Sequence, residues 1–247
     1  MTLLQADATS RALYLDLMKR ILTNVIYPEA EKDYDPVRRA AGADWPPFAH
    51  TMIGLRRLDN LQMCAEVVLG DRVPGDLVET GVWRGGASIF MRAILKAWGE
   101  AGRRVWVADS FQGLPTPDPE RYPEDERSGL HNFKELAVPF EEVRRNFERY
   151  GLHDDGVRFL KGWFRDTLAG APIDSIAVLR LDGDMYESTH QALVALYPRL
   201  SPGGFVIIDD WALEGCRKAV EDYRAAQGIA ESIKIIDWCG AYWRRST

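Results

Sequence analysis

The chain has 247 residues, of which 46% are hydrophobic and 28% are charged, and its formal net charge at pH 7 is −6. These values are typical of one large globular α/β domain, and the negative charge disfavours nucleic acid and anionic membrane surfaces, which both attract clustered lysine and arginine. No stretch is apolar for long enough to cross a bilayer and no secretory leader is recognisable, so we expect a cytoplasmic protein.

Residues 1–75 are expected to form a helical extension or cap ahead of the main domain. Apolar side chains recur at helical spacing over 13–25, and this period predicts a helix with one apolar face. Prolines and acids interrupt the pattern over 27–47, which predicts a loop. A second helix is expected from about residue 51 to residue 69, because glycine and proline follow it.

Short apolar runs alternate with helix-length periodic segments over 76–247. This alternation requires crossover connections and therefore predicts a doubly wound, mostly parallel sheet in an α/β fold. The last two runs are joined by a short link and should form an antiparallel pair at one edge. The seven runs that we expect to be strands are 77–78, 105–108, 157–160, 176–179, 205–208, 233–236 and 241–243.

Residues 112–139 interrupt the alternation with an irregular segment. It is rich in proline and contains the acidic run Glu124–Glu126. A long loop inside a compact domain is usually functional or disordered. Because the core pattern resumes on both sides, we interpret this insertion as a substrate lid rather than a linker.

A glycine-rich turn follows the first predicted strand and opens a helix. Its glycines allow a tight turn and close approach of a ligand, but they do not form the dinucleotide fingerprint. Glu79 would repel a pyrophosphate and suits a ligand that carries an ammonium or sulfonium group. The alternative is an ordinary strand-to-helix turn with an incidental acid.

Asp109 ends the second predicted strand, about thirty residues after Glu79. In doubly wound folds an acid at this place binds the hydroxyl groups of a ribose. An acid there is also common as a helix cap or turn residue. Its distance from the glycine-rich turn favours the ribose interpretation.

Acidic side chains end two more predicted strands, Asp182 and Asp184 after one and Asp209 and Asp210 after the other. The carboxyl ends of neighbouring parallel strands open on the same crevice, so these groups are expected to converge. Converging carboxylates repel one another unless a proton or a cation lies between them, and hard oxygen ligands suit Mg²⁺. Together these acids predict a metal site, although either pair alone is compatible with a turn.

The cysteines and histidines predict no further site. Cys64, Cys216 and Cys239 are widely separated, so we expect buried, unreactive thiols. The histidines have no metal-ligand spacing. His50, just before a helix, and His131, in the expected lid, remain candidates for contact with a substrate.

Several longer blocks of sequence carry a family resemblance. They are Ala49–Met52 with Leu58–Leu61, Glu79–Gly86, Asp109–Pro115, Leu181–Thr189 and Pro202–Trp211. In these blocks and their order, the chain resembles the macrocin O-methyltransferase family from about residue 13 to residue 243. The resemblance implies a Rossmann-like class I methyltransferase that uses S-adenosylmethionine and Mg²⁺ to methylate sugar hydroxyls of macrolides, aminocoumarins and other natural products.

The resemblance also implies residue roles. Glu79 and Gly81 would approach the methionine end of S-adenosylmethionine, and Asp109 and Ser110 would hold its ribose. Asp182 would act as general base. The remaining implied cofactor contacts are Thr51, Met52, Trp163 and Asp182, and the implied metal ligands are Asp182, Asp209 and Asp210. We expect a small hydroxylated glycoside as acceptor and a homo-oligomeric assembly.

Three other functions remain as alternatives. Asp182 and Asp184, separated by one residue, also match the acid motif that holds a metal and a diphosphate in nucleotide-sugar glycosyltransferases. Glu79 in the glycine-rich turn and the second acid pair argue against that class. The others are a phenol or catechol O-methyltransferase and a cofactor-binding module without catalytic activity.

Overall fold

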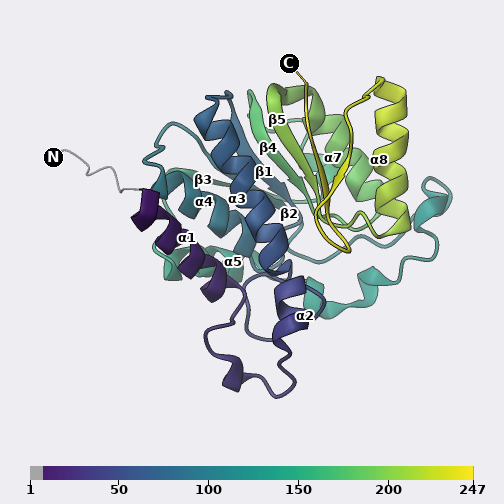
Figure 1. The fold of residues 1–247 in the computed structure, drawn as a ribbon. Helices are drawn as coiled ribbons and strands as arrows, with labels where there is room; N and C mark the ends of the chain where they lie inside the picture. The colour runs from purple at the N-terminus through teal and green to yellow at the C-terminus, as the bar shows by residue number, and fades with distance from the viewer. Residues whose placement is uncertain (1–7, 247) are drawn as a thin grey trace.

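The computed structural model describes residues 8–246 and is built on a seven-stranded sheet with the order β3-β2-β1-β4-β5-β7-β6 (Figure 1). Strands β1 to β5 are parallel, whereas β7 runs antiparallel to β5 and β6, which confirms the predicted fold and edge pair. The strand order reverses between β1 and β4, where open α/β sheets bind ligands. The strands are β1 Asp76–Thr80, β2 Val105–Asp109, β3 Val157–Lys161, β4 Ile176–Leu181, β5 Leu200–Ile208, β6 Lys234–Ile235 and β7 Ala241–Arg244.

Helices cover both faces of the sheet (Figure 1). The first predicted helix is α1, and the second begins three residues later than expected, at Gly54. The predicted loop over 27–47 contains a short helix, α2, which Asp35 caps by accepting the amide hydrogens of Val37 and Arg38. The helices are α1 Ala8–Leu22, α2 Pro36–Ala41, α3 Gly54–Gly70, α4 Gly86–Ala97, α5 Phe140–Arg149, α6 Phe164–Thr167, α7 Tyr186–Leu196 and α8 Glu214–Gln227.

The core has two parts, one on each face of the sheet. Successive strand residues point to opposite faces, so Leu77 enters one cluster and Val78 enters the other. The first cluster includes Leu15 of α1 and Leu58 of α3, and the second includes Leu193 of α7. The described part of the N-terminal extension, residues 8–75, therefore shares a core with the sheet, and residues 1–7 lie outside the described range.

The segment 112–139 follows β2 and runs along the lower right side of the molecule in Figure 1, in teal. Its only regular elements among these residues are three single turns, η2 Pro123–Asp125, η3 Leu130–Asn132 and η4 Lys134–Leu136. Trp83 donates its indole hydrogen to the carbonyl of Glu135 at 2.9 Å. The segment is therefore attached to the glycine-rich turn after β1.

Two further predictions from the sequence concern membrane-spanning segments and the cysteines. Among residues 8–246, no helix is long and apolar enough to cross a membrane. Cys64, Cys216 and Cys239 are all buried and free, as predicted. Burial raises the pKa of each thiol, which keeps it protonated and unreactive near neutral pH.

Candidate active site

A cavity of about 340 Å³ opens at the carboxyl ends of β1, β2, β4 and β5. Its walls also include residues of the 112–139 segment and of the loops before α3 and after β6. Every predicted site residue lines this one cavity: Thr51, Met52, Glu79, Gly81, Asp109, Ser110, Trp163, Asp182, Asp209 and Asp210. Residues as far apart in the sequence as Thr51 and Asp210 thus line one cavity, at the edge of the sheet where the strand order reverses.

The glycine-rich turn brings the backbone of β1 against the loop after β4. Gly81 has φ +79°, and a Cβ atom at this position would lie 1.6 Å from the carbonyl oxygen of Asp182. The amide of Gly86, the first residue of α4, donates to the carbonyl of His50 at 2.9 Å. Glycine at position 81 is therefore required by both backbone conformation and contact with the acidic loop.

Glu79 is buried at the floor of the cavity. It accepts hydrogen bonds from the hydroxyl of Ser88 and from the guanidinium of Arg180. Burial raises the pKa of Glu79 to about 7, although Arg180 opposes the shift. A cationic ligand would stabilise its ionised form.

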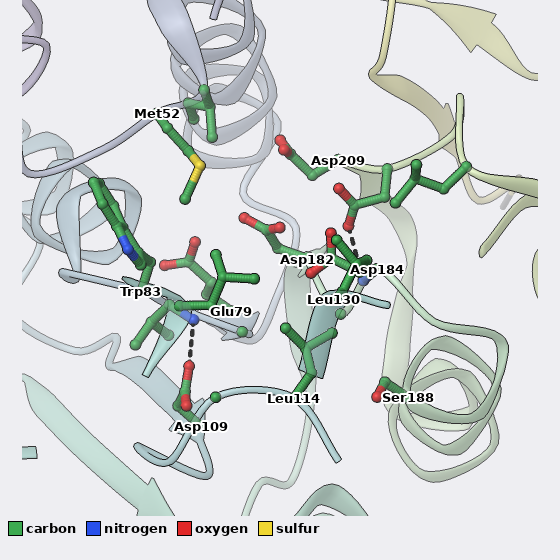
Figure 2. A pocket seen from close by; sticks show the side chains of 18 of the residues that line it. Met52, Glu79, Trp83, Asp109, Leu114, Leu130, Asp182, Asp184, Ser188 and Asp209 are labelled. Atoms are coloured by element: carbon green, nitrogen blue, oxygen red, sulfur yellow. Dashed lines mark hydrogen bonds between the residues drawn. The ribbon is translucent and has the colours of Figure 1, made fainter. Parts of the chain in front are cut away.

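Asp109 joins the end of β2 to the glycine-rich turn. Its carboxylate accepts the amide hydrogens of Val82 at 2.7 Å and of Phe111 at 2.6 Å. Figure 2 shows this side chain below Glu79, whereas Asp182 and Asp184 lie to the right of Glu79. Asp109 therefore has a structural role in the turn, and it also faces the cavity where a ribose is expected.

Removing the Asp109 carboxylate is expected to weaken cofactor binding. In Asp109→Ala, two amide hydrogens lose their acceptor and the predicted ribose contact is lost, which should cost about 1 to 3 kcal/mol of binding free energy. Calorimetric titration with S-adenosylhomocysteine measures this loss.

Asp76 provides the matched control, because it bridges β1 and β2 at the opposite edge of the sheet. Its carboxylate accepts the amide of Arg104 and the indole hydrogen of Trp106. Asp76→Ala should lower stability and leave the affinity for S-adenosylhomocysteine unchanged. If Asp109→Ala shows the same pattern, Asp109 only supports the turn.

The acids after β4 and β5 converge as predicted (Figure 2). One carboxylate oxygen each from Asp182, Asp184 and Asp210 lies within 4.8 Å of the others. Burial is the largest cause that raises the pKa of Asp182 to about 6 and that of Asp184 to about 7, and the neighbouring carboxylates add to it. The pKa of Asp210 is raised well above its ordinary value for the same reasons. This group needs a proton or a cation between its members.

Asp209 is placed differently from its three neighbours. One of its oxygens accepts from Arg57 and the other accepts from Arg180. Asp209 is thus held by two arginines, whereas Asp184, which was not among the implied metal ligands, lies inside the carboxylate group. Figure 2 shows Asp209 beside that group, so the four acids share one end of the cavity.

Arg57 and Arg180 are the main site residues that sequence reasoning missed. Arg180 is fully buried and bonds Glu79, Asp182 and Asp209 at once. Arg57 contacts Asp209 and also donates to the carbonyl of Gly42 at 3.0 Å. A signal for Arg180 was present, because an arginine inside an otherwise apolar strand must find acidic partners.

Neither histidine candidate lines the cavity. The Nδ1 atom of His50 lies 2.7 Å from the hydroxyl of Tyr150, and burial lowers the pKa of His50 to about 4. Its backbone carbonyl, by contrast, positions the first residue of α4. His131 lies next to Leu130, which does line the cavity.

The chain is similar in sequence and fold to known O-methyltransferases. The family model "Macrocin-O-methyltransferase (TylF)" matches residues 29–245. A 4'-O-methyltransferase of 8-demethyl-8-(2,3-dimethoxy-alpha-L-rhamnosyl)-tetracenomycin-C from Streptomyces olivaceus is 60% identical, covering 96% of this chain and 94% of the relative. The mycinamicin III 3''-O-methyltransferase of Micromonospora griseorubida is 52% identical over 98% of this chain and 99% of its own. The solved structure of the O-methyltransferase NovP superposes with a TM-score of 0.93 at 53% identity, covering 96% of this chain and 100% of that one.

Proposed function

The chain belongs to the macrocin O-methyltransferase family, and from this we propose that it methylates a sugar hydroxyl of a natural-product glycoside, with S-adenosylmethionine as donor and Mg²⁺ as cofactor. The observation that carries the proposal is the carboxylate group after β4 and β5, which shares one cavity with the glycine-rich turn. A relative named for methylation of a rhamnosyl compound supports a sugar acceptor in antibiotic biosynthesis.

The cofactor is assigned to the β1 and β2 side of the cavity. The turn at Gly81 lets the backbone approach the methionine end of the cofactor, and Glu79 provides a negative charge for its cationic groups. Asp109 and Ser110 are assigned to the ribose. Thr51, Met52 and Trp163, which line the same cavity, would complete the pocket.

The carboxylate group fits a divalent cation. Neither the buried Asp210 nor the partly buried Asp184 forms a salt bridge within residues 8–246, so neither carboxylate has a compensating positive charge. We assign the metal to Asp182, Asp209 and Asp210, with Asp184 beside them. Asp209 would bind the metal through an oxygen that it shares with, or releases from, Arg57 or Arg180.

Asp182 is the assigned general base. A bound Mg²⁺ would supply the positive charge that lowers the pKa of the acceptor hydroxyl. Asp182 would take the hydroxyl proton while the oxygen attacks the methyl carbon of the sulfonium, which leaves S-adenosylhomocysteine. Arg180 donates to Asp182 at 2.7 Å and orients it, and the 112–139 segment limits access of water.

Removing divalent metal is expected to stop methyl transfer without preventing cofactor binding. After treatment with excess EDTA, turnover should fall to background and return when Mg²⁺ is added beyond the chelator. Calorimetry should meanwhile show S-adenosylhomocysteine binding to the chelated protein. Full turnover in the chelated sample would contradict the metal assignment.

The decisive experiment tests donor and acceptor separately. Thermal-shift measurements should show stabilisation by S-adenosylhomocysteine and none by uridine diphosphate, which separates a methyltransferase from a glycosyltransferase. Methyl transfer from labelled S-adenosylmethionine is then measured over a panel of demethylated natural-product glycosides, their aglycones and simple catechols. Methylation of glycosides alone supports the proposal, and preferential methylation of catechols or aglycones would overturn it.

A further inference from the structure

Asp125 is the one residue between Gln112 and Ala137 whose side chain is buried. It is 2% exposed, although its neighbours Glu124 and Glu126 are exposed. Burying a carboxylate is costly unless it is hydrogen-bonded, so a buried acid in an exposed, charged segment needs specific partners.

Those partners are at the start of α7, about sixty positions away. One oxygen of Asp125 accepts the amide hydrogen of Tyr186 at 2.7 Å, and the other accepts that of Glu187 at 2.9 Å. The residue that precedes the helix, Met185, supplies no side-chain cap. Asp125 therefore caps α7 from a distant part of the chain, and its charge is favourable beside the positive end of the helix dipole.

The start of a second helix, α8, packs against the same contact. Gly215 is the second residue of α8, and a Cβ atom there would lie 3.1 Å from the Asp125 carboxylate and 3.3 Å from the amide nitrogen of Tyr186. A side chain at position 215 would press on the Asp125 contact. The segment thus meets the beginnings of the two helices that follow β4 and β5.

The helix start that Asp125 holds is next to the acids of the site. Asp184, two residues before Tyr186, has φ +58°, an uncommon conformation for a residue other than glycine. Its amide donates to the Asp210 carboxylate at 3.0 Å. A shift in the first turn of α7 would therefore move Asp184 relative to Asp210 and change the spacing of the carboxylate group.

We propose that Asp125 is a positioning residue that fastens the 112–139 segment to α7 and thereby sets the arrangement of the acids after β4. The inference rests on the proposed function for the role of those acids. The 112–139 segment, which lines the cavity, and the loop that carries Asp182 and Asp184 would then be joined through the buried contact of Asp125. The segment would therefore belong to the part of the site that binds metal and acceptor.

The test compares Asp125→Ala and Asp125→Asn with the control Glu126→Gln, which removes one exposed neighbouring charge. Hydrogen exchange of the Tyr186 and Glu187 amides should accelerate roughly 3- to 30-fold in Asp125→Ala, the range for loss of a helix cap. Asp125→Asn keeps one carbonyl acceptor and should give an intermediate result. Circular dichroism verifies that each variant is folded.

Binding measurements then separate positioning from simple attachment of the segment. Calorimetry should show unchanged affinity for S-adenosylhomocysteine in all variants. Affinity for Mn²⁺, followed by electron paramagnetic resonance, should fall roughly 10- to 100-fold in Asp125→Ala, as for other residues that orient metal ligands, and recover partly in Asp125→Asn. The catalytic constant for methyl transfer should fall with it.

Two outcomes would overturn the inference. Unchanged exchange at Tyr186 and Glu187 would show that Asp125 does not hold α7. Faster exchange with wild-type Mn²⁺ affinity and turnover would show that Asp125 attaches the segment without positioning the acids. Failure of the wild-type protein to bind Mn²⁺ would instead contradict the proposed function, and exchange would still decide whether Asp125 holds the helix.

Discussion

Methyl transfer is expected to fall by about 10²- to 10⁴-fold in Asp182→Asn, the range for loss of a general base. The amide is nearly the same size as the carboxylate, but it cannot take the proton of the acceptor hydroxyl and is a poorer metal ligand. Binding of S-adenosylhomocysteine should change little, because the glycine-rich turn keeps its own contacts. Single-turnover rates and calorimetry on the same preparation measure the two effects.

Asp184→Asn is the matched control. It changes the same chemical group two positions away, in the same loop, within the same carboxylate group. Arg180 forms ion pairs with Glu79, Asp182 and Asp209 but none with Asp184 among the described residues. We therefore expect the smaller rate loss in Asp184→Asn. Retention of most of the wild-type rate in Asp182→Asn would contradict the mechanism, and a larger loss in Asp184→Asn would reassign the base.

Gly81→Ala is expected to destabilise the protein severely and to prevent binding of S-adenosylhomocysteine. The new methyl group would meet the carbonyl oxygen of Asp182 at 1.6 Å, so the glycine-rich turn and the acidic loop would have to separate. The left-handed backbone adds about 1 to 2 kcal/mol, and forced overpacking adds typically 1 to 3 kcal/mol. Thermal unfolding and calorimetry measure the outcome.

Gly228→Ala isolates the backbone contribution. Gly228 ends α8 with φ +65°, and no atom lies within 4 Å of the position of an added Cβ. Gly228→Ala should therefore be destabilised only by the cost of the left-handed backbone. In a chain of this length each kcal/mol of lost stability lowers the melting temperature by roughly 2 to 4 °C. Equal melting temperatures for the two variants would show that the acidic loop yields to the methyl group.

The alternation of apolar runs predicted the sheet because each run had to be buried on both faces. It also predicted that the acids after β4 and β5 would converge, as Asp182 and Asp210 do, since parallel strands end at one edge. Residue type and place along a strand were sufficient for these conclusions. The family resemblance added the assignment of Thr51, Met52 and Trp163, which no local pattern indicated and which line the cavity.

Contacts between side chains that are distant in sequence were not predictable. The acid pattern did not show that both oxygens of Asp209 would accept hydrogen bonds from arginines. One of these arginines, Arg57, lies on α3, whose sequence is that of an ordinary amphipathic helix. Nor did the acidic run in the 112–139 segment show which of its members is buried. Asp125 differs from its neighbours only through the helix start that it meets in three dimensions.

The contacts of Arg57 make the helical extension before the sheet a part of the site. This residue precedes the sheet in the chain, yet it forms ion pairs with Asp209 after β5 and with Asp237 near β7. The carbonyl of His50, also before the sheet, orients the first residue of α4. A replacement of residues 8–75 by a foreign segment would therefore remove the cation that pairs with Asp209 and Asp237, unless an arginine is kept at position 57.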